Sequence, residues 1–348
     1  MKLLVLPGDG IGPEITAATV AVLQAAARRF GLDLSLEERQ IGLAALAKFG
    51  TTLPDGVLER ARELDGVILG PISHLEYPAP DKGGVNVSAA FRVRLDLYAN
   101  VRPARSRAGL GRAMDLVIMR ECTEGFYPDR NMHLGSGEFM PVPGVALSVR
   151  KITAHACERI ARRAFELAGK RRKLVTAVHK ANVFRVSDGL YLDTVRAVAG
   201  DFPDVRLEEE IVDAMAAKLA RHPERYDVVL ATNFYADILS DLASELSGSL
   251  GLAGSILAGE ARCAAQAQHG SAPDIAGKDR ANPTSLILSA AMLLDWLGEK
   301  RKSENLLRAG KAIDAAVDAV LSSRETRTAD LGGKLGTRAF GEAVAAAL

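Results

Sequence analysis

The sequence predicts an α/β protein of two domains, and three observations indicate this fold class. The chain has 348 residues, more than one ordinary core holds, because domains commonly comprise about 100–200 residues. Short apolar runs typical of buried strands alternate with longer segments whose apolar residues recur at helical spacing. The chain shows no internal repeat and no low-complexity linker, which favours domains that share the chain in an interleaved way.

The elements follow from these patterns in chain order. KLLVLP predicts a buried strand, which enters the glycine turn GDGIG and a helix with Pro13 in its first turn. DGVILG, DLVIMRE, KLVTAVHK and YDVVLAT predict further buried strands, and ACERIARRAFELAG and SDGLYLDTVRAVAGDFP predict amphipathic helices. Residues 136–149 contain prolines and glycines without a helical period and predict an extended arm or hairpin. The Ala/Leu-rich C-terminal part predicts helices.

Composition excludes several functional classes. The formal net charge is +1 and no Lys/Arg-rich run is suited to nucleic acid or an anionic membrane. The three cysteines are far apart and form no CxxC pair, which argues against a structural zinc site and fits a reducing cytoplasm. The N-terminal apolar run is too short for a signal peptide, and no stretch is long enough for a membrane span. We therefore expect a soluble cytoplasmic protein.

The turn GDGIG follows a strand and opens a helix, as a nucleotide-binding turn does. Its spacing is GxGxG, however, and a dinucleotide fingerprint requires GxGxxG with an acidic residue about 20 positions later. A tight strand-to-helix turn is the better interpretation. GxxxxGK[ST], the phosphate loop of P-loop proteins, does not occur in the chain.

Two basic side chains, Arg120 and Lys180, lie at the ends of predicted apolar strands. Arg92, Arg102 and Arg120, if they converge, would bind a dicarboxylate or tricarboxylate through paired hydrogen bonds, although any single arginine is more often a surface residue. Lys180 follows the strand in KLVTAVH. There it is either a surface lysine with a buried stem or, if desolvated, a base with a depressed pKa.

Three aspartates suggest a cation site. Asp213 lies in an otherwise apolar pentamer, IVDAM, and a buried aspartate must be paired or bind a metal. Asp237 and Asp241 are four residues apart at the expected start of a helix, so they share one face. Alternatively, Asp237 is an ordinary first-turn aspartate whose charge the helix dipole stabilises. Three carboxylates with substrate oxygens and water would suit Mg²⁺ or Mn²⁺. Residues 269–283, HGSAPDIAGKDRANP, taken alone predict a loop.

Taken together and in this order, these segments resemble the isocitrate/isopropylmalate dehydrogenase family of metal-dependent β-decarboxylating dehydrogenases. The matching segments span nearly the whole chain: LPGDGIGPE, RVRLDLYANVRP, RECTEGFY, HKAN, VDAM, ATNFYADILSDLAS and HGSAPDIAGKDRANP. The resemblance implies an α/β two-domain fold of the isopropylmalate dehydrogenase type, with a large mixed sheet flanked by helices, not a Rossmann fold. It implies a cofactor-binding domain at residues 1–98 and 248–348, and a small domain at 99–247 whose arm at 136–149 clasps a dimer.

The resemblance also implies roles for individual residues. Arg92, Arg102 and Arg120 match the carboxylate clamp, Tyr127 the residue that protonates carbon after decarboxylation, and Lys180 the base acting from the neighbouring subunit. Asp213 of one subunit, with Asp237 and Asp241 of the other, matches the metal ligands. The cofactor-binding positions are Asn182, His269, Gly270, Ser271, Ala272, Asp274, Ile275 and Asn282.

The resemblance implies a homodimer with a shared active site, and dimers could pair further into tetramers. In this family the metal binds the substrate hydroxyl and carboxylate, and hydride passes to the nicotinamide. Asp274 is placed to accept bonds from a ribose 2′-OH and to repel a 2′-phosphate, which predicts NAD in preference to NADP. With a cation between Asp237 and Asp241, Asp237→Asn is expected to abolish metal-dependent turnover while changing metal-free stability little.

The segment before the first clamp arginine departs from the patterns of the family. Asn86 and Ser88 occupy substrate-binding positions with the residue types of isocitrate enzymes exchanged, and Ala89 lies where homoisocitrate enzymes can carry an extra arginine. Cys122 and Gln266 replace an asparagine and a glutamate that are common in the family. We therefore expect NAD-dependent oxidative decarboxylation of a 3-substituted malate with a modest substituent.

Two other functional classes remain open at this stage. A non-catalytic regulatory subunit of a hetero-oligomeric dehydrogenase is expected to lose metal or base residues, whereas this chain has Lys180, Tyr127 and three aspartates. A Mg²⁺-dependent phosphoryl-transfer enzyme could use a similar aspartate pair, but the chain has no phosphate loop.

Overall fold

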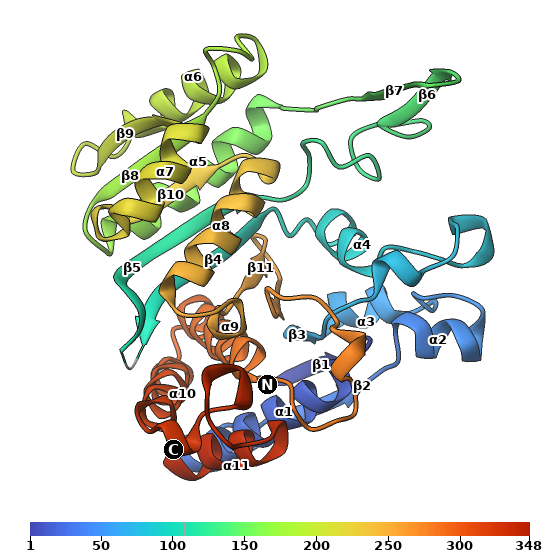
Figure 1. The fold of residues 1–348 in the computed structure, drawn as a ribbon, viewed down its shortest axis with the longest axis vertical. Coiled ribbons are helices and arrows are strands. Elements are labelled where there is room, and N and C mark those ends of the chain that lie inside the picture. Colours follow the sequence, from blue (N-terminus) through green and yellow to red (C-terminus); the bar gives the residue numbers. More distant parts are fainter. Residues whose placement is uncertain (108) are drawn as a thin grey trace. The chain divides into compact units, whose positions relative to one another are not determined.

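A computed structural model describes residues 1–107 and 109–348, which divide into two compact units. Unit 1 comprises Met1–Leu95, Arg107–Leu110 and Gly248–Leu348, and unit 2 comprises Asp96–Ser106 and Gly111–Ser247. Apart from the β6–β7 pair (residues 138–148), the described residues form ten strands, five in each unit. Helices flank the strands of both units (Figure 1). The predicted α/β class is confirmed. No helix in the described ranges has the length and apolarity that a membrane span requires.

In unit 1 the strand order is β2-β1-β3-β12-β11. β1 pairs in parallel with β2 and β3, β12 pairs in parallel with β3, and β11 runs antiparallel to β12, so this sheet is mixed. β3 is buried along its whole length and β1 over four of five residues, as expected for inner parallel strands. The bounds are β1 (Lys2–Leu6), β2 (Ser35–Glu38), β3 (Gly66–Leu69), β11 (Ile256–Ala258) and β12 (Cys263–Gln266).

The helices of unit 1 follow the predicted pattern. α1 has Pro13 in its first turn, and Gly31 caps its C-terminus with a φ of 62°, in the left-handed region. α9 is buried on most of its surface, and it packs against α10 and β12. The bounds are α1 (Gly12–Phe30), α2 (Gly42–Phe49), α3 (Val57–Glu63), α4 (Val87–Arg94), α9 (Thr284–Arg301), α10 (Glu304–Ser322) and α11 (Thr337–Ala347).

The glycine turn after β1 is a structural turn. Gly8 and Gly10 have φ values of +75° and +57°, and a Cβ on Gly10 would lie 2.0 Å from the carbonyl oxygen of Ser271. Ile11 N–H donates to that same oxygen at 2.8 Å. The buried carboxylate of Asp9 accepts from Leu43 N–H at 2.7 Å and Ser73 N–H at 2.9 Å. The turn thus holds three loops together, which supports the interpretation as a tight turn.

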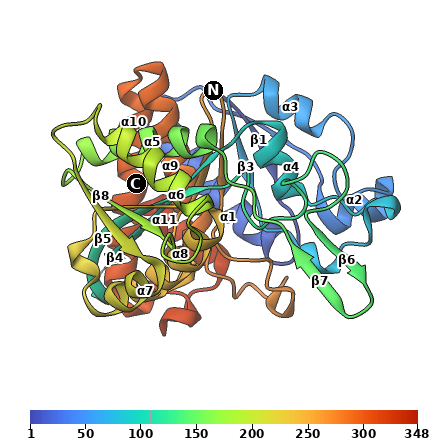
Figure 2. The same cartoon turned by 90° about the horizontal axis from the view of Figure 1, so that it is seen from above.

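In unit 2 the strand order is β4-β5-β10-β8-β9, and β10 pairs in parallel with both β5 and β8. Alternate residues of β5 enter two separate cores. Val117 and Met119 pack with α5 and α6, whereas Leu116 and Ile118 pack with α7 and α8. Helices therefore cover both faces of this sheet, as Figure 2 shows. The bounds are β4 (Ala99–Arg107), β5 (Leu110–Glu121), β8 (Leu174–His179), β9 (Arg206–Ile211), β10 (Val228–Ala231), α5 (Ala154–Gly169), α6 (Ser187–Ala199), α7 (Val212–Arg221) and α8 (Asn233–Ser247).

The predicted arm is a β-hairpin. β6 (Glu138–Val142) and β7 (Val145–Ser148) pair antiparallel, and every residue in both strands is exposed. The hairpin projects away from the other elements of unit 2 (Figures 1 and 2). Large apolar side chains are exposed on it, among them Phe139, Met140 and Leu147. Apolar surface of this kind, on a projecting ribbon, is typical of a protein interface.

Candidate active site

Parallel strands bring the predicted site residues of unit 2 to one edge of its sheet. Ala231, the last residue of β10, pairs in register with Arg120 of β5 and with Val178 of β8. The carboxyl ends of these strands therefore lie together, where α/β proteins place their ligands. Arg120 is the penultimate residue of β5. Tyr127, Lys180 and the start of α8 come shortly after the ends of β5, β8 and β10, respectively.

Five of the predicted residues meet in one cluster. Arg102 comes from β4, Arg120 from β5 and Tyr127 from the segment after β5, and they surround the carboxylates of Asp237 and Asp241 on α8. Arg120 is 1% exposed and Arg102 6%, whereas the side chain of Asp237 is 37% exposed. Two buried guanidinium groups thus face carboxylates that remain partly open to solvent.

Hydrogen bonds fix the orientation of each member of this cluster. The Tyr127 hydroxyl donates to Asp237 Oδ2 at 2.7 Å and accepts from Arg120 Nη2 at 2.9 Å. Arg120 also donates through Nη1 to Asp237 Oδ1. Arg102 Nη1 donates to Asp237 Oδ1 at 3.1 Å and to Ser240 Oγ at 2.7 Å, and it lies 3.5 Å from Asp241 Oδ1. Neither guanidinium group depends on a bound ligand for its charge balance.

The position of the aspartates on α8 corrects one expectation. The helix begins at Asn233, so Asp237 lies in the second turn, and the first turn carries no acidic residue. The dipole at the helix N-terminus, whose effect is confined to the first turn, is therefore not what balances the charge of Asp237. The guanidinium groups of Arg102 and Arg120 do so instead. Asp237 and Asp241 share a helix face, as their spacing predicts.

Lys180 and Asp213 form a second group. Lys180 directly follows β8, and its ammonium group pairs with the carboxylate of Asp213 in the first turn of α7. This hydrogen bond lowers the pKa of Asp213. The expectation that Asp213 is buried is wrong, because its side chain is 69% exposed. The apolar neighbours in IVDAM belong to the junction of β9 and α7, where only Met215 of that pentamer is buried.

The carboxylates fit a divalent cation in part. Asp237 and Asp241 offer oxygen ligands of the kind Mg²⁺ and Mn²⁺ prefer. Asp213 is engaged with Lys180, and no group of three or more His, Cys, Asp or Glu side chains within residues 1–107 and 109–348 is arranged to hold a metal. A single chain therefore presents two of the three expected carboxylates together.

The predicted cofactor segment lies in unit 1, against the glycine turn. Asp274 is exposed within a short 3-10 helix (Pro273–Ile275), so its carboxylate is open to a ligand. Burial lowers the pKa of His269, and its Nε2 is buried with no hydrogen-bond partner in the described chain. Asn282 is less open: Oδ1 accepts from Thr284 N–H at 3.0 Å, and Nδ2 donates to Asp330 Oδ2 at 3.0 Å. The open Asp274 and the unpartnered His269 nitrogen fit a polar nucleotide ligand.

Four of the five remaining predicted cofactor positions lie in the same segment of unit 1. Ala272 has φ +36°, a left-handed conformation that turns the chain into the short helix. Ser271 is buried, and its hydroxyl accepts from Ser73 Oγ at 2.9 Å. Gly270 is exposed and Ile275 half-buried in the same segment. Asn182, by contrast, belongs to unit 2, where it is exposed two residues after Lys180.

The substrate-specificity positions lie on α4 of unit 1. Asn86 is the N-cap of this helix: its Oδ1 accepts from Ala89 N–H at 3.1 Å. Ser88 donates through Oγ to Oε1 of buried Gln266 at 3.1 Å. Ser88 and Arg92 are four residues apart on α4, so they share one face of the helix. Gln266, noted in the sequence only as a departure, thus contacts a predicted substrate residue.

Comparison with known proteins identifies the family. The profile described as isocitrate/isopropylmalate dehydrogenase matches residues 2–344. The chain belongs to the isocitrate/isopropylmalate dehydrogenase family. It is therefore an enzyme, a β-decarboxylating 2-hydroxyacid dehydrogenase.

Relatives in this family carry different substrate names. The chain is 43% identical to an isocitrate/homoisocitrate dehydrogenase of Thermus thermophilus, covering 100% of this chain and 98% of the relative. It is 38% identical to the 3-isopropylmalate/3-methylmalate dehydrogenase of Methanocaldococcus jannaschii, covering 99% and 98%. A crystal structure of isocitrate dehydrogenase from Methylococcus capsulatus superimposes with a TM-score of 0.88 at 38% identity, covering 99% and 98%. This likeness confirms the predicted fold.

Sequence reasoning missed three buried polar residues around the unit 2 site. Asn233 accepts from Arg120 Nε at 2.8 Å and donates to the Glu124 carbonyl oxygen at 2.6 Å. Arg150 pairs with Asp188, whose side chain is fully buried. Asn233 lies two residues after the end of β10 at Ala231, and this position is a signal of a site residue. Arg150 and Asp188 lie outside the strands, and their pattern carried no such signal.

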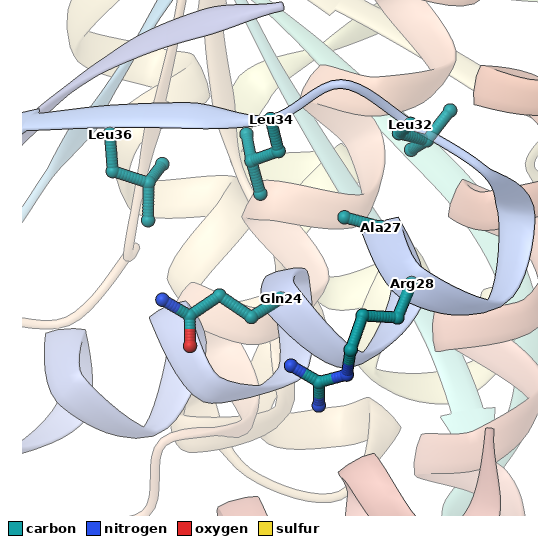
Figure 3. Close-up of a pocket in the computed structure, with 6 residues that line it drawn as sticks. All are labelled: Gln24, Ala27, Arg28, Leu32, Leu34 and Leu36. Carbon is teal, nitrogen blue, oxygen red and sulfur yellow. The ribbon is translucent and has the colours of Figure 1, made fainter.

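One surface cavity in unit 1 contains none of these residues. It has a volume of about 420 Å³ and lies between α1 and the segment that leads into β2 (Figure 3). Its lining combines the polar side chains of Gln24 and Arg28 on α1 with the apolar side chains of Ala27, Leu32, Leu34 and Leu36. None of these side chains is suited to acid–base chemistry near neutral pH, so the cavity is not the reaction site.

Proposed function

We propose that this enzyme oxidises and decarboxylates a 3-substituted malate with NAD and Mg²⁺ or Mn²⁺, as a homodimer with shared active sites. The observation that supports this most is the cluster of Arg102, Arg120 and Tyr127 around Asp237 and Asp241. The buried guanidinium groups suit the carboxylates of a malate, and the exposed aspartates suit a cation. In the family resemblance, Arg92 of α4 contributes a third arginine.

Each polar side chain then has one task. Arg102 and Arg120 orient the substrate carboxylates, because both are held rigidly by buried acceptors. Lys180 in its neutral amine form accepts the proton of the substrate hydroxyl at Nζ and becomes an ammonium, and the Tyr127 hydroxyl delivers a proton to carbon after CO₂ leaves. Asp213, Asp237 and Asp241 would hold the cation. When bound, Mg²⁺ or Mn²⁺ supplies Lewis acidity beside the substrate oxygens, and NAD supplies the hydride acceptor.

A second subunit accounts for the separation of Asp213 and Lys180 from the Asp237 cluster. The pair is partly open to solvent, so it is available to a neighbouring chain. Exposed apolar side chains on α8, Phe234 and Ile238, together with the β6–β7 hairpin, offer the surface that such a dimer would cover. Within this proposal the hairpin is the dimer clasp, and unit 1 binds the cofactor.

The substrate is proposed to carry a modest, mildly polar 3-substituent. Ser88, Gln266 and Ala89 support this choice, because a neutral hydrogen-bonded pair and a small residue adjoin the face of α4 that carries Arg92. Named relatives act on both larger and smaller members of this class, isocitrate/homoisocitrate and 3-isopropylmalate/3-methylmalate. The substituent therefore has to be identified by assay.

NADH formation across a panel of 2-hydroxy-3-carboxy acids tests the proposal. The panel includes malate, 3-methylmalate, isocitrate, homoisocitrate and 3-isopropylmalate, each with and without Mg²⁺ or Mn²⁺. We expect metal-dependent turnover that is fastest on a small 3-substituent and faster with NAD than with NADP. Much faster turnover of isocitrate or 3-isopropylmalate than of every smaller analogue would refute the substrate assignment. A kinetic preference for NADP would refute the role of Asp274.

A further inference from the structure

Arg150 links three segments that carry site residues in unit 2. It lies between the hairpin and α5, and its side chain is only 6% exposed. Nη1 donates to Asp188 Oδ1, and Nη2 donates to the Thr232 hydroxyl at 2.9 Å. Thr232 immediately precedes α8, the helix of Asp237, and its carbonyl oxygen accepts from Ala236 N–H in the first turn of that helix. The guanidinium group thus touches the start of the helix that carries the aspartates.

Aromatic rings enclose the same guanidinium group. Its Cζ lies 4.9 Å from the ring centroid of Tyr235, 5.5 Å from that of Phe184 and 5.6 Å from that of Phe126. These are cation–π distances, and an arginine in contact with three rings has few rotamers available. Phe126 directly precedes Tyr127, and Phe184 lies in the turn that follows Lys180. Contacts with Arg150 therefore join the segment of Tyr127, the proposed proton donor, to that of Lys180, the proposed base.

Asp188 completes the link to Lys180. Its carboxylate is fully buried, and Oδ2 accepts the backbone N–H of Lys180 while Oδ1 accepts from Arg150. A buried ion pair of this kind adds little net stability, because desolvation of both charges offsets their attraction. The pair does fix the direction in which the chain leaves β8, and with it the point from which the Lys180 side chain extends.

We infer that Arg150 and Asp188 are positioning residues that hold the Lys180 backbone and the Phe126–Tyr127 segment in one fixed arrangement at the start of α8. The inference rests on the proposed function, in which Lys180 and Tyr127 move protons. A displacement of either group by about 1 Å can lower turnover on the order of 100-fold. Substrate binding, which depends on Arg102 and Arg120, does not require the Arg150–Asp188 pair.

The test compares four variants of the full-length enzyme. Arg150→Met removes the link, Arg150→Lys keeps the charge, and Asp188→Asn keeps an acceptor for Lys180 N–H but removes the ion pair. Arg171→Gln is the matched control. It breaks another ion pair of unit 2, in which Arg171 Nε lies 2.7 Å from the fully buried Asp227, and the groups that this pair contacts belong to residues outside the proposed site. Steady-state kinetics and hydrogen exchange of the Lys180 amide are measured for all four.

For Arg150→Met we expect kcat to fall by roughly 10-fold to 100-fold with little change in KM, and Lys180 N–H to exchange on the order of 10-fold faster. Arg150→Lys and Asp188→Asn should recover part of both losses, whereas Arg171→Gln should lower the melting temperature only. Unchanged kcat and exchange in Arg150→Met, or equal effects in the control, would overturn the inference. If wild-type enzyme turned over no 3-substituted malate, the proposed function would fail, and amide exchange alone would still decide the positioning role.

Discussion

The buried guanidinium group of Arg120 donates to Asp237, the carboxylate proposed to bind the cation. Arg102 reaches the same carboxylate at 3.1 Å, and Tyr127 donates to it at 2.7 Å. The surroundings of Asp237 are therefore not set by its like-charged neighbour Asp241 alone. Asp237 is the counter-charge of two arginines that are 1% and 6% exposed. The effect of replacing Asp237 on stability therefore depends on the loss of a charged acceptor for these two arginines.

Asp237→Asn is expected to abolish metal-dependent turnover and also to destabilise the metal-free protein. We expect turnover to fall on the order of 100-fold or more, because an amide is a poor ligand for a divalent cation. The free energy of unfolding should fall by about 1–2 kcal/mol, because buried guanidinium groups lose a charged acceptor; solvent exposure of Asp237 keeps the loss below that of a fully buried pair. This replaces the expectation, drawn from the sequence alone, that metal-free stability changes little.

Urea denaturation in the presence of a chelator measures this difference. Asp241→Asn is the matched control, since Asp241 lies 3.5 Å from Arg102 and its side chain is 55% exposed. It should lose turnover but change stability by less than about 0.5 kcal/mol. A metal-free Asp237→Asn protein as stable as wild type would show that like-charge repulsion, and not arginine pairing, dominates at this position.

The sequence was sufficient to predict the buried strands β1, β3, β5, β8 and β10, the helices α1, α5 and α6, and the hairpin, because these depend on local periodicity and turn chemistry. The family resemblance also implied that Arg102, Arg120 and Asp237 belong to one site, and in unit 2 the two arginines contact Asp237. The sequence could not predict that Asp213 is exposed, since the apolar residues around it point into different environments. Nor could it predict the Arg150–Asp188 pair, whose two residues are 38 positions apart. Such contacts depend on tertiary packing, which leaves no periodic signal in the chain.

Asp295 gives the stability of unit 1 a pH dependence. It lies on α9, with Oδ1 buried and without a partner among the described residues, and burial raises its pKa to about 7. Asp314 and Glu299 raise this pKa further, whereas Lys311 opposes them. Because the folded-state pKa lies above the unfolded value of 3.8, the energetic cost is absent below about pH 4 and complete above about pH 7.

Asp295→Asn should therefore raise the free energy of unfolding by about 1–3 kcal/mol at pH 8 and change it little at pH 4. Thermal unfolding of wild type and variant at both pH values measures this. The low-pH measurement is the internal control, because the wild-type carboxyl is largely protonated there in the folded chain and the cost of its burial as a charge has not yet developed. An equal gain at both pH values would assign the effect to packing rather than to charge.

Gly10 should tolerate no side chain. Its φ of +57° disfavours an L-residue, and a Cβ would meet the Ser271 carbonyl oxygen at 2.0 Å. Gly10→Ala is expected to cost about 2–4 kcal/mol and to raise KM for NAD, because it separates the glycine turn from the proposed cofactor segment. Gly31 is the matched control: its φ is +62° but nothing lies within 4 Å of its Cβ position, so Gly31→Ala should cost about 1 kcal/mol. Melting temperatures and KM for NAD would show whether the two differ as expected.

Sharing of the active site predicts complementation between inactive variants. In the proposed dimer each site combines Asp237 of one subunit with Lys180 of the other. Lys180→Met and Asp237→Asn homodimers should both be inactive. When their subunits are mixed and exchanged, half of the dimers become hybrids, and each hybrid regains one site with both residues intact. We expect about one quarter of wild-type activity to return.

A second mixture controls for recovery by any other route. Lys180→Met and Asp213→Asn would both lie on the side contributed by the neighbouring subunit, so each site of their hybrid lacks one of the two groups. That mixture should remain inactive under the same exchange conditions, with dimer formation confirmed by light scattering. Recovery in the second mixture would show that Lys180 and Asp213 reach one site from different subunits, against the proposal. Absence of recovery in the first mixture, despite exchanged dimers, would place Lys180 and Asp237 in the same subunit's site. The ion pair between Lys180 and Asp213 would then have to open within one chain before the cation could bind.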